Sequence, residues 1–387
     1  MRAVISAALP WAAPVATMAV LSIAISFTFP LFALLLERMG VTGMMVGLNH
    51  TLAAIAMVVS APILPGIMAR VGAVPLALSA IAVMALATAS IPMFENYWWW
   101  GCLRIALGFS ITSLFYVSEY WLVAQAPDSS RGRIVAIYTV VLSGSYMVGP
   151  VLLAWLGPDS VLTFAIPVTV ILAGAIPVLV ARRKAPEPDG ADAKPPLAML
   201  RFLWTDPMVM WGVVLFGVIE FGAMGLIANW GIRSGYDEST AVQFVFWLAA
   251  GSMALQLPIG WLADRLDRRY LLTAAGLVAV VMPLLIVAIS DAFWGVAAAI
   301  FLWGGMAVGM YTLALVELGA RYSGTALAEA NAAVVLCYGL GALFAPLLLG
   351  LAMDIVPPDG ALYFAAVCAV AYLGLAAVRL RIPRAEP

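Results

Sequence analysis

Long apolar stretches alternate with short polar segments along the whole chain. A stretch of about 20 apolar residues can cross the hydrocarbon layer as an α-helix, whereas the strands of a β-barrel are shorter and alternate in polarity. The pattern therefore predicts an all-α integral membrane protein with twelve transmembrane helices. We expect these helices at residues 11–36, 43–68, 73–93, 97–123, 132–157, 161–181, 207–232, 240–263, 270–290, 293–317, 327–353 and 360–379.

The longest polar segment, residues 182–206, follows the sixth apolar stretch. It carries the basic run Arg182, Arg183 and Lys184 together with four prolines, a composition typical of a linker. We therefore expect an N-terminal six-helix bundle over residues 1–181, a cytoplasmic linker over 182–206 and a C-terminal six-helix bundle over 207–387. A cleaved signal peptide is the alternative for the first stretch, but 11–36 is longer than the apolar region of such a peptide, which has roughly 7–15 residues.

Composition agrees with a membrane protein. The chain is 65% hydrophobic and 10% charged, with a mean hydropathy of +1.06, whereas a soluble domain has roughly 25% charged residues. A net charge of −1 does not indicate binding to nucleic acid. Cys102, Cys337 and Cys368 lie in apolar stretches without metal-ligand spacing, and we expect them to be packing residues. We expect no metal site and no cofactor.

Lysine and arginine placement predicts the orientation. If both termini are cytoplasmic, only Arg38 and Arg233 lie on the outer side, and Arg104 lies within a span. All other basic residues then lie inside, as the positive-inside rule requires. These are Arg2, Arg70, Arg131, Arg133, Arg182, Arg183, Lys184, Lys194, Arg201, Arg265, Arg268, Arg269, Arg321, Arg379, Arg381 and Arg384.

The two halves resemble each other at equivalent positions. Residues 65–72, after the second stretch, correspond to 258–269, after the eighth, and Glu119 corresponds to Glu317. Gly149-Pro150 likewise corresponds to Ala345-Pro346. Two similar halves joined by a linker are the arrangement in which one half can rock against the other around a central site.

Several motifs resemble those of the major facilitator superfamily. The run Gly260-x-x-x-Asp264-Arg265-x-x-Arg268-Arg269 resembles the family's cytoplasmic loop motif, G-x-x-x-D-R-x-G-R-R, with Asp267 in place of the usual glycine. Its first-half counterpart keeps Gly66, Arg70 and Gly72 and lacks the aspartate and the distal arginines. The resemblance implies secondary transport and does not identify a substrate.

Further motifs extend this resemblance. Arg104-x-x-x-Gly108 is similar to the family's R-x-x-x-G motif, and Gly144 to Pro150 loosely matches a G-x-x-x-G-P motif associated with its antiporters. The segment Glu119-Tyr120-Trp121-Leu122, followed by Arg131-Gly132-Arg133 and Tyr138, resembles a branch of bacterial facilitators. We therefore expect a protein of a bacterial inner membrane.

Ionisable residues at membrane depth are functional candidates because hydrocarbon disfavours charge. Glu220 lies midway along the seventh stretch and is the candidate proton carrier; the alternative is a structural carboxylate neutralised by a hydrogen bond or an arginine. The resemblance implies a coupling role for Arg104, and the alternative is an arginine that snorkels to the outer interface near Trp98. His50 can titrate near neutral pH, or it can be a hydrogen-bonded packing residue.

Charged residues at the inner ends of the helices predict a cytoplasmic gate. We expect Glu119 to pair with Arg131 or Arg133, and Glu317 with Arg265, Arg268 or Arg321, when the cytoplasmic side is closed. Asp264 and Arg269 belong to the same predicted gate, with Arg70 as its first-half remnant. Positive-inside topology alone would explain the arginines but not Asp264.

Polar and small residues also occur inside the later stretches. Asn229-Trp230-Gly231, at the outer end of the seventh, predicts a weak point in the helix that would suit an outer gate. Asn331 and Tyr338 in the eleventh are interpreted as polar contacts between helices.

Aromatic residues within the spans help to predict the chemical class of the solute. If Phe115, Tyr116, Trp247, Trp303 and Tyr311 face the cavity, they favour an amphipathic or aromatic organic solute over a small ion; packing in the core is the alternative for each. The spans contain no basic cluster, which argues against phosphorylated solutes.

These observations together predict a secondary transporter that moves a small organic solute by alternating access, coupled to protons, with efflux by antiport preferred. Proton-driven uptake of a planar nutrient such as a vitamin-like compound is the first alternative, and a non-transporting membrane sensor the second. An enzyme is not expected, because the spans hold no catalytic constellation, and the chain has no phosphate-binding loop of an ATP-driven pump. The expected partners are the solute, protons and lipid, and the expected state is a monomer.

Overall fold

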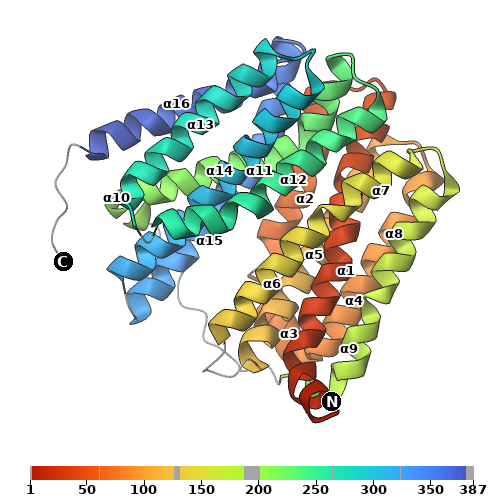
Figure 1. The fold of residues 1–387 in the computed structure, drawn as a ribbon. Helices are drawn as coiled ribbons and strands as arrows, with labels where there is room; N and C mark the ends of the chain where they lie inside the picture. Colours follow the sequence, from red (N-terminus) through yellow and green to blue (C-terminus); the bar gives the residue numbers. More distant parts are fainter. Residues whose placement is uncertain are drawn as a thin grey trace. The chain divides into compact units, whose positions relative to one another are not determined.

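The computed structural model describes residues 2–60, 62–125, 131–186, 201–263, 265–322 and 324–380. Side chains are described from Trp11 onward in these ranges, except at 123, 131–133, 135, 136, 139, 324–329, 331 and 332. All the regular elements in this part of the chain are helices (Figure 1). The prediction of an all-α protein is therefore confirmed.

The helices follow the predicted stretches closely. They are α1 (Arg2–Arg38), α2 (Gly43–Ser60), α3 (Leu64–Val71), α4 (Ala73–Ala89), α5 (Tyr97–Gln125), α6 (Arg131–Tyr146), α7 (Val148–Leu156), α8 (Val161–Ala173), α9 (Ala175–Ala181), α10 (Phe202–Thr205), α11 (Pro207–Arg233), α12 (Glu238–Ala263), α13 (Arg268–Ala288), α14 (Phe293–Arg321), α15 (Gly324–Ile355) and α16 (Gly360–Leu380), with short 3-10 turns at Ile91–Met93 and Arg182–Lys184.

Eleven segments in the described residues are long and apolar enough to cross a membrane. The fifth predicted stretch is the pair α6–α7, whose apolar part, Val140–Leu156, is shorter than these. The break falls at Met147, within the Gly144 to Pro150 motif, and Pro150 removes a backbone donor there. A Cβ atom at Gly149 would overlap Ser26 and Phe27 of α1, so the motif also allows α7 to approach α1 closely.

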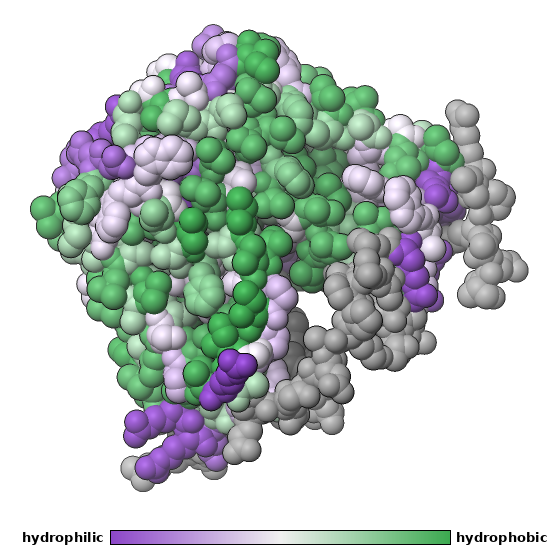
Figure 2. All heavy atoms as spheres, turned by 180° about the vertical axis from the view of Figure 1, so that it is seen from behind, coloured by the Kyte–Doolittle hydropathy of each residue, from purple (hydrophilic) through white to green (hydrophobic). Residues whose placement is uncertain are grey.

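Large apolar side chains are exposed along many of the helices. Leu86, Trp155, Val161 and Leu257 are among the most exposed of them. On the face drawn in Figure 2, hydrophobic residues cover most of the coloured surface. Such extended apolar exposure is expected where the solvent is lipid.

The chain divides into two compact units. The first comprises Met1–Leu35 and Leu52–Ala193, and the second comprises Leu36–Thr51 and Lys194–Pro387. The predicted division into bundles at 1–181 and 207–387 stays a prediction. The end of α1, the following turn and the first half of α2 make their contacts with the second unit.

Small residues set the packing inside each unit. In the first unit, a Cβ atom at Gly108 of α5 would overlap the carbonyl oxygen of Ala53 on α2. In the second unit, α12 packs mainly against α14, where Gly251 abuts the Phe301 carbonyl and Gly304 abuts the Leu248 carbonyl. Without a hydrophobic driving force between helices in lipid, such close backbone contact is a main source of helix association.

Gly251→Ala is expected to destabilise the second unit, because the added methyl group overlaps the Phe301 carbonyl oxygen and must push α12 away from α14. Overpacking of this kind costs about 1–3 kcal/mol. The measurement is the thermal unfolding midpoint of the detergent-purified protein. Gly374→Ala is the matched control, since a Cβ atom there meets open space. Equal midpoints for both variants would show that the α12–α14 contact is not tight.

Candidate functional site

Glu220 lies near the middle of α11, as the sequence predicts, and its side chain accepts a hydrogen bond from the Tyr338 hydroxyl of α15. Two glycines bring these helices together. A Cβ atom at Gly217 would lie 2.5 Å from the carbonyl oxygen of Tyr338, and one at Gly341 would overlap the carbonyl oxygen of Val214. The α11–α15 backbone contact therefore positions the hydroxyl at the carboxylate.

Aromatic rings surround this pair. The ring of Phe216, one turn before Glu220, stacks on Tyr338 with a centroid distance of 5.3 Å and an interplanar angle of 28°. Tyr311 of α14 lies 5.5 Å from Phe216, and Phe221 contacts Tyr338 edge-on at 6.1 Å. Glu220, Phe221, Tyr311 and Tyr338 are all partly exposed. We call Phe216, Glu220, Phe221, Tyr311 and Tyr338 the α11 cluster.

The α11 cluster contains residues that sequence analysis assigned elsewhere or did not single out. Tyr311 was predicted as a cavity aromatic, and Tyr338 as a polar contact between helices. Phe216 and Phe221 were missed, although the four-residue spacing from Phe216 to Glu220 places the two on one face of a helix. No sequence signal pairs α11 with α15, because their contact joins residues far apart in the chain.

The other predicted cavity aromatics lie elsewhere. Trp303 is 1% exposed and belongs to the core of the second unit. Trp247 contacts Trp294 and Phe246, so it belongs to a separate aromatic group. Phe115 and Tyr116 are partly exposed residues of α5 in the first unit. Of the five, only Tyr311 lies in the α11 cluster.

Arg104 lies in the first unit and is 1% exposed. Its guanidinium lies 4.8 Å and 4.3 Å from the ring centroids of Phe29 and Phe32 on α1, so both rings contribute cation–π attraction. The side chain is enclosed and does not reach an outer surface as the snorkelling interpretation requires. A coupling role with Glu220 stays a prediction.

His50 belongs to the segment of α2 that groups with the second unit and is 1% exposed. It packs against α11 at Gly225, where a Cβ atom would lie 3.2 Å from the imidazole Cγ. Gly225 is five positions after Glu220 in the same helix. The fold thus brings His50 to the helix that carries the candidate proton site.

Several of the residues predicted for the gate have close partners at adjacent helix ends. Arg268 pairs with Glu317 at 3.2 Å. Arg265 lies over the Trp261 ring at 3.8 Å, and Arg269 contacts Asp267 at 3.4 Å. Asp267 also accepts a hydrogen bond from the backbone N–H of Arg269, which makes it the N-cap of α13. This cap accounts for an aspartate where the family motif has glycine.

The remaining gate residues are not brought together in the described structure. Asp264 and the side chains of Arg131 and Arg133 lie outside the described residues. Glu119 and Arg70 are exposed, and neither forms an ion pair with a described side chain. Their pairing stays a prediction.

A second ion pair at the helix ends was not predicted from the sequence. Arg321 at the end of α14 binds Asp206, which precedes α11 and whose side chain is fully buried. The Tyr322 hydroxyl donates to the same carboxylate at 2.6 Å. Burial, and then the hydrogen bond and charge of Asp206, raise the pKa of Tyr322. The sequence placed Arg321 on the inner side but gave no signal for its partner.

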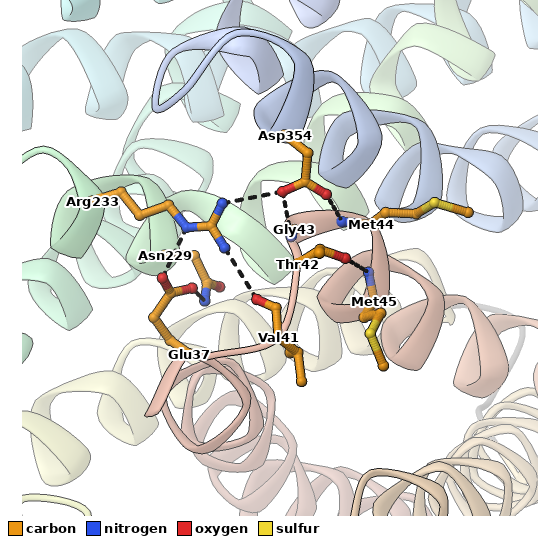
Figure 3. Close-up of polar contacts among 9 residues, drawn as sticks. All are labelled: Glu37, Val41, Thr42, Gly43, Met44, Met45, Asn229, Arg233 and Asp354. Carbon is orange, nitrogen blue, oxygen red and sulfur yellow. Dashed lines mark hydrogen bonds and ion pairs between the residues drawn. The ribbon is translucent and has the colours of Figure 1, made fainter. Parts of the chain in front are cut away.

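A third polar group lies around the turn between α1 and α2 (Figure 3). Arg233, at the end of α11, contacts Glu37 at 2.8 Å and Asp354 of α15 at 3.3 Å. Asn229 donates to the second oxygen of Glu37 at 2.7 Å. The α11 helix continues through Asn229 to Arg233, so the predicted weak point at 229–231 is wrong.

The carboxylate of Asp354 binds the start of α2. Its two oxygens accept hydrogen bonds from the backbone N–H groups of Gly43 and Met44 at 2.6 and 2.7 Å (Figure 3). The first N–H groups of a helix lack intrahelical partners, and a carboxylate there also interacts favourably with the helix dipole. Asp354 therefore caps α2 from another helix. We call Glu37, Asn229, Arg233 and Asp354 the outer cluster.

Helices of these lengths in two units, with a carboxylate at mid-helix depth, define a multi-span membrane transport protein. The family model described as Major Facilitator Superfamily matches residues 15–328 and 248–387. The chain belongs to this family, whose members with this fold are membrane transporters. The resemblance that sequence analysis found in the loop motif is thereby confirmed.

Relatives and solved structures agree with this assignment. The chain is 22% identical over 344 residues to the uncharacterised MFS-type transporter YfkF of Bacillus subtilis, covering 87% of this chain and 86% of that protein. It is 25% identical over 270 residues to YcaD of Escherichia coli, covering 68% of each. A nucleoside transporter NupG mutant superposes with a TM-score of 0.80 at 11% identity, covering 96% of this chain and 100% of that one. A bacterial homologue of the lysosomal transporter Spinster superposes with a TM-score of 0.71 at 16% identity, covering 96% and 95%.

Arg321→Gln is expected to destabilise the protein, because it leaves the fully buried Asp206 carboxylate without its cation. Arg321 is itself 45% exposed, so the loss is that of one donor to a buried carboxylate that the Tyr322 hydroxyl still contacts, about 1–3 kcal/mol. The measurement is the thermal unfolding midpoint in detergent. The control is Arg379→Gln, which removes an arginine that donates only to the Trp204 carbonyl at 3.4 Å. A fall no larger than that of the control would contradict the structural role of the pair.

Proposed function

We propose that this protein is a proton-coupled secondary transporter of a small organic solute, amphipathic or aromatic, in a bacterial inner membrane. Both termini face the cytoplasm, and the preferred direction is export by antiport. The observation that carries the proposal is the α11 cluster, in which an acidic side chain at membrane depth is hydrogen-bonded by Tyr338 and bordered by aromatic rings.

Glu220 is suited to carry the coupled proton. A carboxylate in low-dielectric surroundings exchanges between neutral and ionised forms, and each form favours a different state of the transporter. The Tyr338 hydroxyl donates to the ionised form, so the proton can leave without stranding a bare charge. The partly exposed rings of Phe221, Tyr311 and Tyr338 offer apolar surface to an organic solute next to this proton site.

The inner-end residues fit a gate that opens and closes once per cycle. The Arg268–Glu317 pair, with Arg265 and Arg269 nearby in the loop motif, fastens α13 to α14 in the second unit. In this proposal Asp264, Glu119, Arg131, Arg133 and Arg70 complete the gate on the cytoplasmic side. In this proposal the N-terminal and C-terminal bundles, joined by the predicted linker at 182–206, move relative to each other.

Glu220→Gln is expected to abolish proton-driven transport while the protein stays folded, because glutamine keeps the shape and cannot exchange a proton. The assay uses proteoliposomes with an imposed pH gradient and three aromatic solutes: benzyltrimethylammonium, p-toluenesulfonate and uridine. Antiport predicts accumulation when protons leave the vesicle, and uptake by symport predicts accumulation when protons enter it.

The control is Glu95→Gln, which changes an exposed glutamate outside the spans. Wild type and this control should accumulate at least one of the solutes, and Glu220→Gln none. Equal gradient-driven accumulation by wild type and Glu220→Gln would contradict the proposed role of Glu220. Binding of a solute without any movement across the vesicle would favour the sensor.

A further inference from the structure

We propose that the α11 cluster selects an organic cation, with an ammonium group at Glu220 and an apolar body against the rings. This inference rests on the proposed function and narrows its solute class. The charges around Glu220 are the first observation that supports it. In the second unit, Glu220 is the only acidic residue in the middle of a membrane-spanning helix among the described residues, and no described lysine or arginine lies at a comparable depth.

The described lysines and arginines of the second unit all lie at helix ends or in loops. They are Arg38, Arg201, Arg233, Arg265, Arg268, Arg269, Arg321 and Arg379. The ionised form of Glu220 therefore has no lysine or arginine partner among the described residues of its own unit, and a hydrogen bond from a neutral hydroxyl offsets only part of its charge. His50 of the same unit packs against Gly225, five positions further along α11. A negative charge at this depth favours entry of a positive one, either a proton or an ammonium group.

The rings add selectivity for a cation with an organic body. The faces of aromatic rings carry negative electrostatic potential, and a cation near a ring face gains about 0.5–2 kcal/mol. Phe216 and Tyr338 are stacked at 5.3 Å, and Tyr311 lies 5.5 Å from Phe216, so three rings form one group with the tyrosine that donates to the carboxylate. A small inorganic cation would make no use of this apolar surface, whereas a substituted ammonium compound contacts both the carboxylate and the rings.

Proton and solute then compete for one carboxylate. Binding of the ammonium group requires the ionised form, so the affinity rises with pH until Glu220 is fully ionised. Other titratable groups in the middle of the helices around α11 are Tyr311 of α14, Tyr338 and Cys337 of α15, Tyr372 of α16, and His50 of α2, which packs against Gly225. Glu317 and Asp354 lie at helix ends and are paired with Arg268 and Arg233. Glu220 and His50 are therefore the two candidates for the pH dependence, and its loss in Glu220→Gln would assign it to Glu220. Competition at one site couples export of the cation to entry of a proton.

The test measures binding of benzyltrimethylammonium and p-toluenesulfonate to the purified protein by calorimetry at pH 8 and pH 6. We expect wild type to bind the cation more tightly than the anion, and more tightly at pH 8. Glu220→Gln should weaken cation binding about tenfold or more, a factor that corresponds to about 1.4 kcal/mol. Glu95→Gln should bind as wild type does. Tyr338→Phe, which keeps the ring and removes the donor, should retain the preference for the cation.

Three results would overturn the inference: no measurable binding of the cation, equal binding of the two ions, or equal cation affinity in wild type and Glu220→Gln. Preference for the anion would overturn the inference as well. The proposed function fails separately. If uridine or p-toluenesulfonate is transported with Glu220-dependent proton coupling, the function stands and only the cation class is wrong.

Discussion

The backbones of α11 and α15 meet at Gly217 and Gly341 with no room for a side chain between them. This contact determines where the Tyr338 hydroxyl lies, and hence that Glu220 has a hydrogen-bond partner at membrane depth. The same approach stacks Phe216 on Tyr338. A larger residue at either glycine would separate the helices, leave the carboxylate without its donor and open the ring stack. The chemistry of the α11 cluster thus depends on two residues that have no functional groups of their own.

Apart from Arg104, which is enclosed by aromatic rings, several charged residues away from the cluster are paired with an opposite charge. Arg268 has Glu317, Arg321 has Asp206, and Arg233 has both Glu37 and Asp354. These pairs lie at helix ends, where the bilayer gives way to water. A transporter that alternates between states needs contacts of this kind, because they can be exchanged for water, whereas a buried apolar interface cannot be opened so readily.

The outer cluster depends on contacts that no local pattern in the sequence indicates. Chain continuity assigns residues 36–51 to the first bundle, and the predicted boundary at the linker follows from that. In the structure the segment packs on the second unit, because Asp354 caps α2 and because Gly43, Gly47 and Gly350 admit close backbone contact. Neither cause is visible as a local pattern, since each joins residues more than two hundred positions apart.

Local patterns by themselves determined a great deal. Apolar stretch length established the helical membrane class, basic residues established an expected orientation, and the Gly260–Arg269 motif indicated the family. A single acid in the middle of an apolar stretch identified Glu220. The inferences about fold class and family are confirmed, and the first of them succeeds because hydrocarbon penalises exposed charge and unpaired backbone regardless of the fold. The orientation and the role of Glu220 stay predictions.

Only the tertiary structure decided which side chains meet. It placed Tyr338, Phe216 and Tyr311 around Glu220, enclosed Arg104 between Phe29 and Phe32, left Trp303 in the core, and gave Arg321 the partner Asp206. Helices that cross a membrane are hydrophobic on all sides. Their sequences therefore carry little information about how each helix is rotated about its axis or which other helices it contacts. That information lies in the small residues of facing helices, whose complementarity exists only once the helices are packed.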